Sequence, residues 1–165
     1  MFLRWSHGFV QMTRRFLDHQ LFAQTLLQPT RDSQCKSGRA LLMVASSTWE
    51  HSLLNLLRSY IENGDIHGLH PVIFAAVGKV AGLDEENIVF AFLHSFLTSL
   101  CGASIRLGKV GHINAQIILK EMGPALNQVA KIATLSRMDD IWSCPPFLDI
   151  AQLAHSTFPQ KLFSN

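Results

Sequence analysis

Residues 101–133 read CGASIRLGKVGHINAQIILKEMGPALNQVAKIA and predict the end of one helix, a glycine-rich turn and a second helix. From Asn114 onward the apolar residues recur every three or four positions, which is typical of an amphipathic helix with one buried stripe. Because Pro124 has no backbone N–H to donate to the Lys120 carbonyl, we expect this helix to kink or restart there. The stripe predicted to be buried comprises Ile118, Met122, Ala125, Leu126, Val129 and Ala133.

The segment that precedes this turn predicts an almost wholly apolar helix from about Glu85 to Ile105. The 18 residues from Ile88 to Ile105 carry no formal charge, and a stretch of that length can cross a membrane. A narrow polar strip favours a buried place inside a helical bundle instead, and it consists of His94, Ser95, Thr98 and Ser99. We therefore expect a central buried apolar helix with Leu97 facing inward. A helical membrane-associated protein that uses residues 88–105 is the alternative.

Upstream of this helix, local signals predict shorter helices separated by loops. A first helical segment is expected to end near Gln28, because Pro29 and the polar run 30–37 are typical of a loop. Ser47 and Glu50 have the spacing of a capping box, which predicts that a helix begins at Ser47.

Glycine, proline and aspartate mark the next helix ends. Asn63-Gly64 is typical of a helix C-terminus, Pro71 suits the first position of the following helix, and Gly82 suits its C-terminal cap. Asp84 predicts an N-cap for the apolar helix. Alternating apolar and polar runs are absent from the sequence, so we expect an all-α, single-domain helical bundle over residues 1–165.

Composition narrows the class of protein. Hydrophobic residues make up 48% of the chain and charged residues only 16%, which indicates surface reserved for partners. A net charge of +2 without a Lys/Arg cluster argues against a nucleic-acid partner. The 3 cysteines form no C-x-x-C motif, which favours a reducing cytoplasm over a disulfide-stabilised extracellular fold.

Catalytic motifs are not supported by the spacing of the reactive residues. Lys79 and Lys109 each follow a glycine, but the first glycine and the hydroxyl residue of a phosphate-binding loop are missing at both. No nucleophile motif is present, so we expect no enzymatic activity and no bound cofactor. His67 and His70 are the tightest histidine pair, but loop histidines usually bond backbone groups, so no metal site is assigned. A weak nickel-binding storage protein using this pair is a further alternative.

An ordered set of motifs resembles the UreF family of urease accessory proteins. The turn follows the pattern A-x-x-R-L-G and then G-x-x-x-x-Q, from Ala103 to Gln116. The resemblance covers roughly Asp18 to Asn165, and its N-terminal F-P-x-G-x-x-x-H-S pattern is not found, so the chain is expected to lack the family's N-terminal segment. The other matching segments are Gly68 to Val72, Gly78, Gly82-Leu83, Met138 to Ile141, Pro146 to Ile150, His155 and Lys161 to Ser164.

The resemblance implies a non-catalytic, all-α adaptor in the complex that delivers nickel to apo-urease in the cytoplasm. The implied partners are a UreD-like (UreH-like) protein, a UreG-like GTPase, apo-urease itself and a second copy in a homodimer, with neither membrane nor nucleic acid. Polar groups beside the flexible glycines suit docking to the GTPase, namely Arg106, Lys109, His112 and Gln116. The tail Lys161-Leu162-Phe163 suits the UreD-like partner, although Lys161 replaces the family's usual arginine and loses its planar fork.

Overall fold

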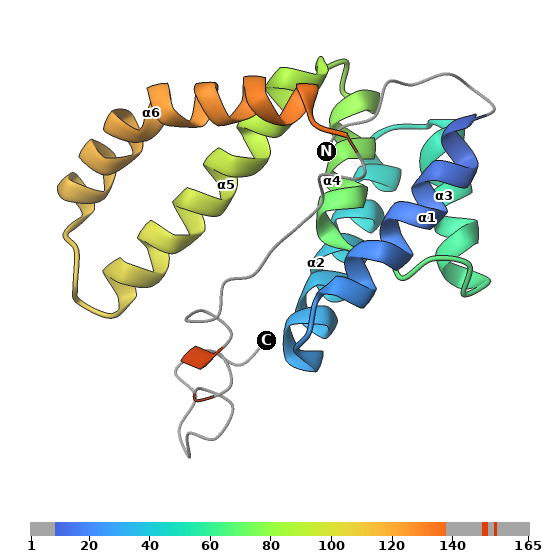
Figure 1. Cartoon of the computed structure of the whole chain (residues 1–165), viewed down its shortest axis with the longest axis horizontal. Helices are drawn as coiled ribbons and strands as arrows, with labels where there is room; N and C mark the ends of the chain where they lie inside the picture. The colour runs from blue at the N-terminus through green and yellow to red at the C-terminus, as the bar shows by residue number, and fades with distance from the viewer. Residues whose placement is uncertain (1–8, 138–149, 152–153, 155–165) are drawn as a thin grey trace. The chain divides into compact units, whose positions relative to one another are not determined.

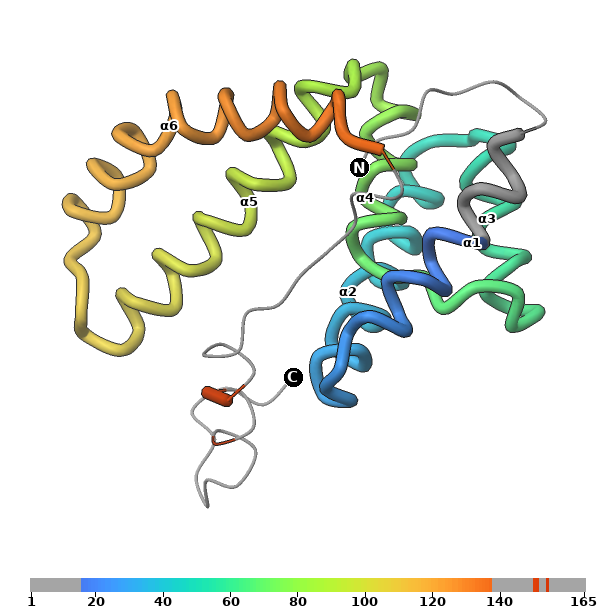
Figure 2. Tube along the Cα trace, in the orientation of Figure 1, coloured from blue at the N-terminus to red at the C-terminus, as the bar shows by residue number. Residues whose placement is uncertain are grey.

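The computed structural model describes residues 9–137, 150–151 and 154. Residues 9–137 contain six α-helices (Figures 1 and 2). No strand occurs among the described residues, so the predicted all-α class is confirmed. The helices are α1 (Phe9–Gln24), α2 (Gln28–Thr48), α3 (Ser52–Glu62), α4 (His70–Val80), α5 (Glu85–Arg106) and α6 (His112–Leu135).

The described stretch divides between Val77 and Gly78, inside α4, into two compact units. We call them the N-terminal unit, residues 9–77, and the hairpin unit, residues 78–137. The expectation of one domain over residues 1–165 stays a prediction.

In the N-terminal unit, α2 packs against α3 and begins at Gln28. The polar run 30–37 is helical, so its prediction as a loop is wrong. Pro29 lies in the first turn of α2, where a missing N–H costs no intrahelical hydrogen bond, and it therefore starts this helix. The buried apolar side chains of the unit are Leu42, Ala45, Leu54, Leu57, Ile66, Leu69, Ile73 and Ala76.

The predicted capping box at Ser47 is also wrong. Ser47 lies inside α2, and its hydroxyl donates to the Met43 carbonyl at 2.9 Å. The cap of α3 is His51, whose Nδ1 accepts from the backbone N–H of Leu53 at 3.1 Å. An imidazole nitrogen can serve this purpose because any side-chain acceptor that reaches the first turn satisfies a free donor.

The segment between α3 and α4 passes very close to α2. A Cβ built on Gly38, in the middle of α2, would lie 2.9 Å from the backbone nitrogen of His70 and would overlap the Gly68 carbonyl oxygen. Gly68 itself has a φ of +76°, a conformation that glycine adopts without strain. Two glycines far apart in sequence therefore let this segment pack directly on the α2 backbone.

In the hairpin unit, α5 and α6 lie side by side and are joined by a short turn (Figure 1). The predicted N-cap of α5 is confirmed, because the Asp84 carboxylate accepts from the backbone N–H of Asn87 at 2.8 Å. The prediction that α5 is a central buried helix is wrong for the described residues, since only 17% of its most apolar 18-residue window is buried. Leu97 is half-buried. Helix α6 covers one side of α5 and leaves the opposite side exposed.

Helix α6 runs through Pro124 without interruption, so the expected restart does not occur. Its fully buried residues are Ala115, Leu126 and Ala130, whereas Met122 and Val129 are exposed. The predicted stripe is thus rotated, because small alanines allow close packing of the two helices and the larger side chains turn outward.

Candidate functional site

The turn between α5 and α6 is a glycine-ended helix cap. The backbone N–H of Lys109 donates to the Ser104 carbonyl at 2.9 Å, and that of Gly108 donates to the Ile105 carbonyl at 2.9 Å. Gly108 has a φ of +68°. This pair of hydrogen bonds with a left-handed glycine is the Schellman motif, which satisfies the last carbonyls of α5 and reverses the chain.

The four polar residues predicted to bind a partner are brought together at this end of the hairpin. Arg106 is the last residue of α5, Lys109 lies in the turn, and His112 begins α6. Gln116 follows one helical turn later, and all four residues are exposed. The other predicted contact, Lys161-Leu162-Phe163, lies outside the described residues.

Exposed apolar side chains next to this turn were missed in the sequence because the helix was assumed to be buried. Phe96, Leu100 and Leu107 follow one another at spacings of four and seven, and the helical period places them along one side of α5. Phe96 is 59% exposed and Ile113, at the start of α6, is 78% exposed. Ile117 is exposed as well, and we call these five side chains of the hairpin together the hairpin patch. Exposed apolar side chains gathered on one part of a protein commonly bind other proteins.

A second cluster joins α1 to the segment before α4. Asp18 in α1 is fully buried, and its carboxylate accepts from the backbone N–H of His67 at 2.5 Å and from that of Leu69 at 2.9 Å. Charge-assisted hydrogen bonds of this kind offset the cost of burying a carboxylate. Both oxygens of the Asp18 carboxylate therefore accept a backbone hydrogen bond, and the carboxylate anchors the segment.

The His67 side chain lies between two aromatic rings of α1. Phe22 stacks on it with centroids 3.6 Å apart, and His19 approaches edge-on with centroids 5.0 Å apart. Burial lowers the pKa of His67, while the charge of Asp18 opposes that shift. The histidine next to His67 is thus His19. The ring of His70 lies beside Phe74 instead, with ring centroids 5.7 Å apart. Burial lowers the pKa of His70.

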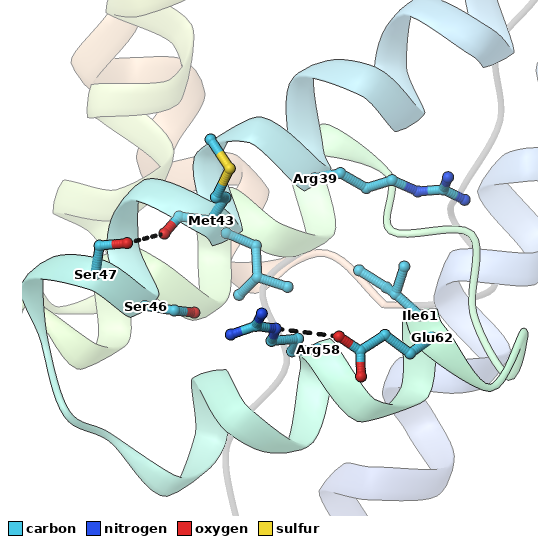
Figure 3. A pocket seen from close by; sticks show the side chains of 8 residues that line it. Arg39, Met43, Ser46, Ser47, Arg58, Ile61 and Glu62 are labelled. Carbon is cyan, nitrogen blue, oxygen red and sulfur yellow. Dashed lines mark hydrogen bonds and ion pairs between the residues drawn. The ribbon is translucent and has the colours of Figure 1, made fainter.

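A cavity of about 330 Å³ lies between α2 and α3 (Figure 3). Arg58 donates to Glu62 at 3.1 Å on its wall, so the pair presents little net charge. The buried hydroxyl oxygen of Ser46 has no hydrogen-bond partner among the described residues. Arg39, whose Nε donates to the His67 carbonyl at 3.3 Å, adds a positive charge, so the lining combines apolar and charged side chains and indicates no single class of ligand. It comprises Arg39, Leu42, Met43, Ser46, Ser47, Arg58, Ile61 and Glu62.

Two further observations limit the chemistry of the described part of the chain. It contains no group of three or more His, Cys, Asp or Glu side chains that could hold a metal ion. By length and composition alone, α5 is long and apolar enough to cross a membrane, with a mean hydropathy of 1.8. A core helix of a soluble protein passes the same test, so this is weak support for a membrane span.

Comparison with known proteins matches the UreF family, whose sequence model aligns with residues 11–123. The urease accessory protein UreF of Trichodesmium erythraeum is 50% identical over 151 residues, which is 92% of this chain and 65% of that protein. UreF of Agrobacterium fabrum is 31% identical over 73% of this chain and 51% of its own length. UreF of Yersinia enterocolitica is 26% identical over 85% of this chain and 61% of its own length.

The chain thus spans less than two thirds of the length of these relatives. No solved structure matches it with significance.

Proposed function

Because this chain belongs to the UreF family of urease accessory proteins, we propose that it is a non-catalytic adaptor in urease maturation. In this proposal it joins a UreD-like protein and a UreG-like GTPase to apo-urease in the cytoplasm, and the complex inserts nickel. Nickel is the cargo of the complex. The three partners, the cytoplasm and a homodimer are part of the proposal, implied by the family resemblance.

The observation that carries the proposal is the exposed end of the α5–α6 hairpin. Four exposed polar residues lie at this end, and the exposed apolar side chains of the hairpin patch lie on the same two helices. An apolar centre with a polar rim is the usual make-up of a protein–protein interface. We propose that this end binds the GTPase, with the hairpin patch as the apolar centre and Arg106 and Lys109 on the rim.

Binding of the GTPase to paired variants tests this assignment. Ile117→Glu places a charge in the hairpin patch, and we expect it to weaken binding at least thirtyfold, because central interface contacts are worth about 2 kcal/mol or more. Asn127→Glu is the matched control, since Asn127 is an exposed polar residue of the same helix. Equal affinities for the two variants, measured by isothermal titration calorimetry, would place the GTPase elsewhere.

A charge reversal tests the rim. Arg106→Glu with Lys109→Glu is expected to slow association and to reduce its salt dependence, because rim charges steer encounter more than they hold a complex. Lys36→Glu with Lys131→Glu, at two exposed positions away from the turn, changes the net charge by the same amount and is the control. Association rates that change equally in both variants would reflect net charge alone.

The C-terminal tail is assigned to the UreD-like partner. Phe163→Ala is expected to weaken that complex roughly a hundredfold and to reduce nickel-dependent urease activation, with helix content unchanged. If Phe163 instead belongs to the domain's own core, the melting temperature falls first. Unchanged binding per folded molecule would then reject the tail as a binding element.

A second candidate function follows from the length and apolar composition of α5. A membrane-associated protein would place this helix in lipid, where the exposed imidazole of His94 would be costly. The hydroxyls of Thr98 and Ser99 add little to that cost, because they donate to the carbonyls of His94 and Ser95 within the helix. Carbonate extraction of membranes separates the two candidates. An adaptor of soluble proteins is released, whereas a spanning protein stays with the lipid.

A further inference from the structure

Two imidazole rings from distant parts of the N-terminal unit lie with a ring nitrogen of one next to a ring nitrogen of the other. Nδ1 of His19, in α1, lies 3.2 Å from Nε2 of His67, 48 residues further along the chain. The other nitrogen of His19, Nε2, lies 3.0 Å from the Asp65 carbonyl oxygen. A carbonyl can only accept, so Nε2 of His19 carries the proton and donates it. In neutral His19, Nδ1 then has a lone pair directed at His67.

From this geometry we propose that His19 and His67 form a binding site for one divalent metal ion, with Nδ1 of His19 and Nε2 of His67 as its ligands. Bonds from zinc to imidazole nitrogen are about 2.0–2.1 Å long. Two such bonds at an angle of roughly 100° place the ligating nitrogens about 3.2 Å apart. The observed separation therefore fits two ligands on one ion as well as it fits the present hydrogen bond, and on binding the proton of neutral His67 would move from Nε2 to Nδ1, so that both ligating nitrogens present lone pairs.

The surroundings hold both rings in the ligating orientation. The Asp65 carbonyl fixes the tautomer of His19, which is the usual role of a carbonyl behind a metal-bound histidine. Phe22 stacks on the His67 ring with an interplanar angle of 7°, and the His67 backbone is anchored on Asp18. Little rotamer freedom remains to be lost when an ion binds.

Access is compatible with a cation, and the nearby charges are of both signs. The charge of Asp18 attracts it toward the His67 ring, and the charges of Arg31 and Arg39 oppose this. Burial lowers the pKa of His67, so its ring is neutral and able to coordinate at neutral pH. His19 is exposed, which gives the ion a path from solvent.

Two imidazoles leave coordination positions open. Because the described residues hold no group of three such ligands, water or a donor from another molecule would complete the shell. Open positions are typical of sites that exchange their ion, and imidazole favours zinc, copper and nickel over magnesium or calcium. The proposal stands on the geometry of this cluster and does not depend on the adaptor function.

Titration of the full-length protein with Zn²⁺ and, separately, with Ni²⁺ tests the site. The variants His19→Gln and His67→Asn each remove one ligating nitrogen and retain an amide near the position of the other. We expect wild type to bind one equivalent and each variant to bind at least tenfold more weakly. The double variant should lose no more than either single variant, because both remove the same site. His70→Asn is the control, since that ring lies beside Phe74.

Nitrogen NMR of the histidine rings gives a readout that needs no variant. Addition of Zn²⁺ to wild type should shift Nδ1 of His19 and Nε2 of His67 together, while His70 stays unchanged. Absence of these shifts at millimolar Zn²⁺, or binding reduced equally in His70→Asn, would overturn the proposal. Circular dichroism on each variant separates loss of binding from loss of folding.

Discussion

The carboxylate of Asp18 accepts a 2.9 Å hydrogen bond from the backbone N–H of Leu69, a residue 51 positions further along the chain. Its second oxygen accepts from the N–H of His67 at 2.5 Å. One buried side chain thus fastens α1 to the segment that precedes α4. That segment also packs on the α2 backbone at Gly38, so Asp18 and Gly38 hold it from two sides.

Asp18→Asn is expected to lower the free energy of unfolding by about 2–3 kcal/mol. An amide has one acceptor oxygen, so its NH₂ group would face one of the two backbone donors and leave it unsatisfied. Urea denaturation followed by circular dichroism measures the loss. The matched control is Asp32→Asn, because Asp32 is exposed and accepts from Gln28 in the same helix. A loss below about 0.5 kcal/mol at Asp18 would contradict the anchoring role.

Gly38→Ala is expected to destabilise the protein by about 1–3 kcal/mol, because its Cβ would meet the rigid backbone of Gly68 and His70. Gly102→Ala, inside α5, is the control, and its effect on stability is expected to have the opposite sign. A Cβ there has only the Arg106 side chain within reach, at 3.6 Å, so helix propensity should stabilise the variant by about 0.5–1 kcal/mol. Thermal melts of both variants check the two signs, and a stable Gly38→Ala variant would mean that the segment moves away from α2 at little cost.

Gly108→Ala tests the Schellman turn of the hairpin. Apart from its chain neighbours, no atom of the described residues lies within 4 Å of the Cβ position, so the cost is conformational, and a φ of +68° should cost an L-residue about 1 kcal/mol. Gly102→Ala is the control here as well, because Gly102 lies inside α5 and its φ is not positive. Helix propensity should stabilise that variant by about 0.5–1 kcal/mol. Stabilisation of both variants in chemical denaturation would argue against the left-handed conformation of Gly108.

The half-buried imidazole of His70 is expected to make the folded protein less stable in mild acid. Because burial lowers its pKa in the folded state, the unfolded chain takes up the proton first as pH falls through about 6.5. Stability contributed by His70 is therefore complete above that pH and declines until the folded-state pKa is passed. Replacing it in His70→Asn should flatten the pH profile of unfolding between pH 7.5 and 5 relative to wild type. His112→Asn, at an exposed position, is the control, and identical slopes for wild type and His70→Asn would refute the prediction.

Helix ends that depend on nearby residues were predicted correctly from the sequence. Asp84 caps α5, and Pro71 lies at the start of α4. The predictions of a helix end at Pro29 and of a helix start at Ser47 were wrong because proline and serine can each play two local roles. Proline can end a helix or begin one, and serine can cap a helix or donate back to the preceding turn within it, as Ser47 does.

From its sequence, this chain could be assigned to the UreF family as an all-α protein. Each motif and each helix signal depends on residues only a few positions apart, so both can be recognised without the fold. Which side of each helix is covered could not be predicted, since α5 is apolar on nearly all sides and periodicity does not say where its neighbour packs. The pairing of His19 with His67 and the anchoring of Leu69 on Asp18 were equally hidden. Contacts between residues about 50 positions apart form only when the packed helices bring them together, and no local pattern encodes that.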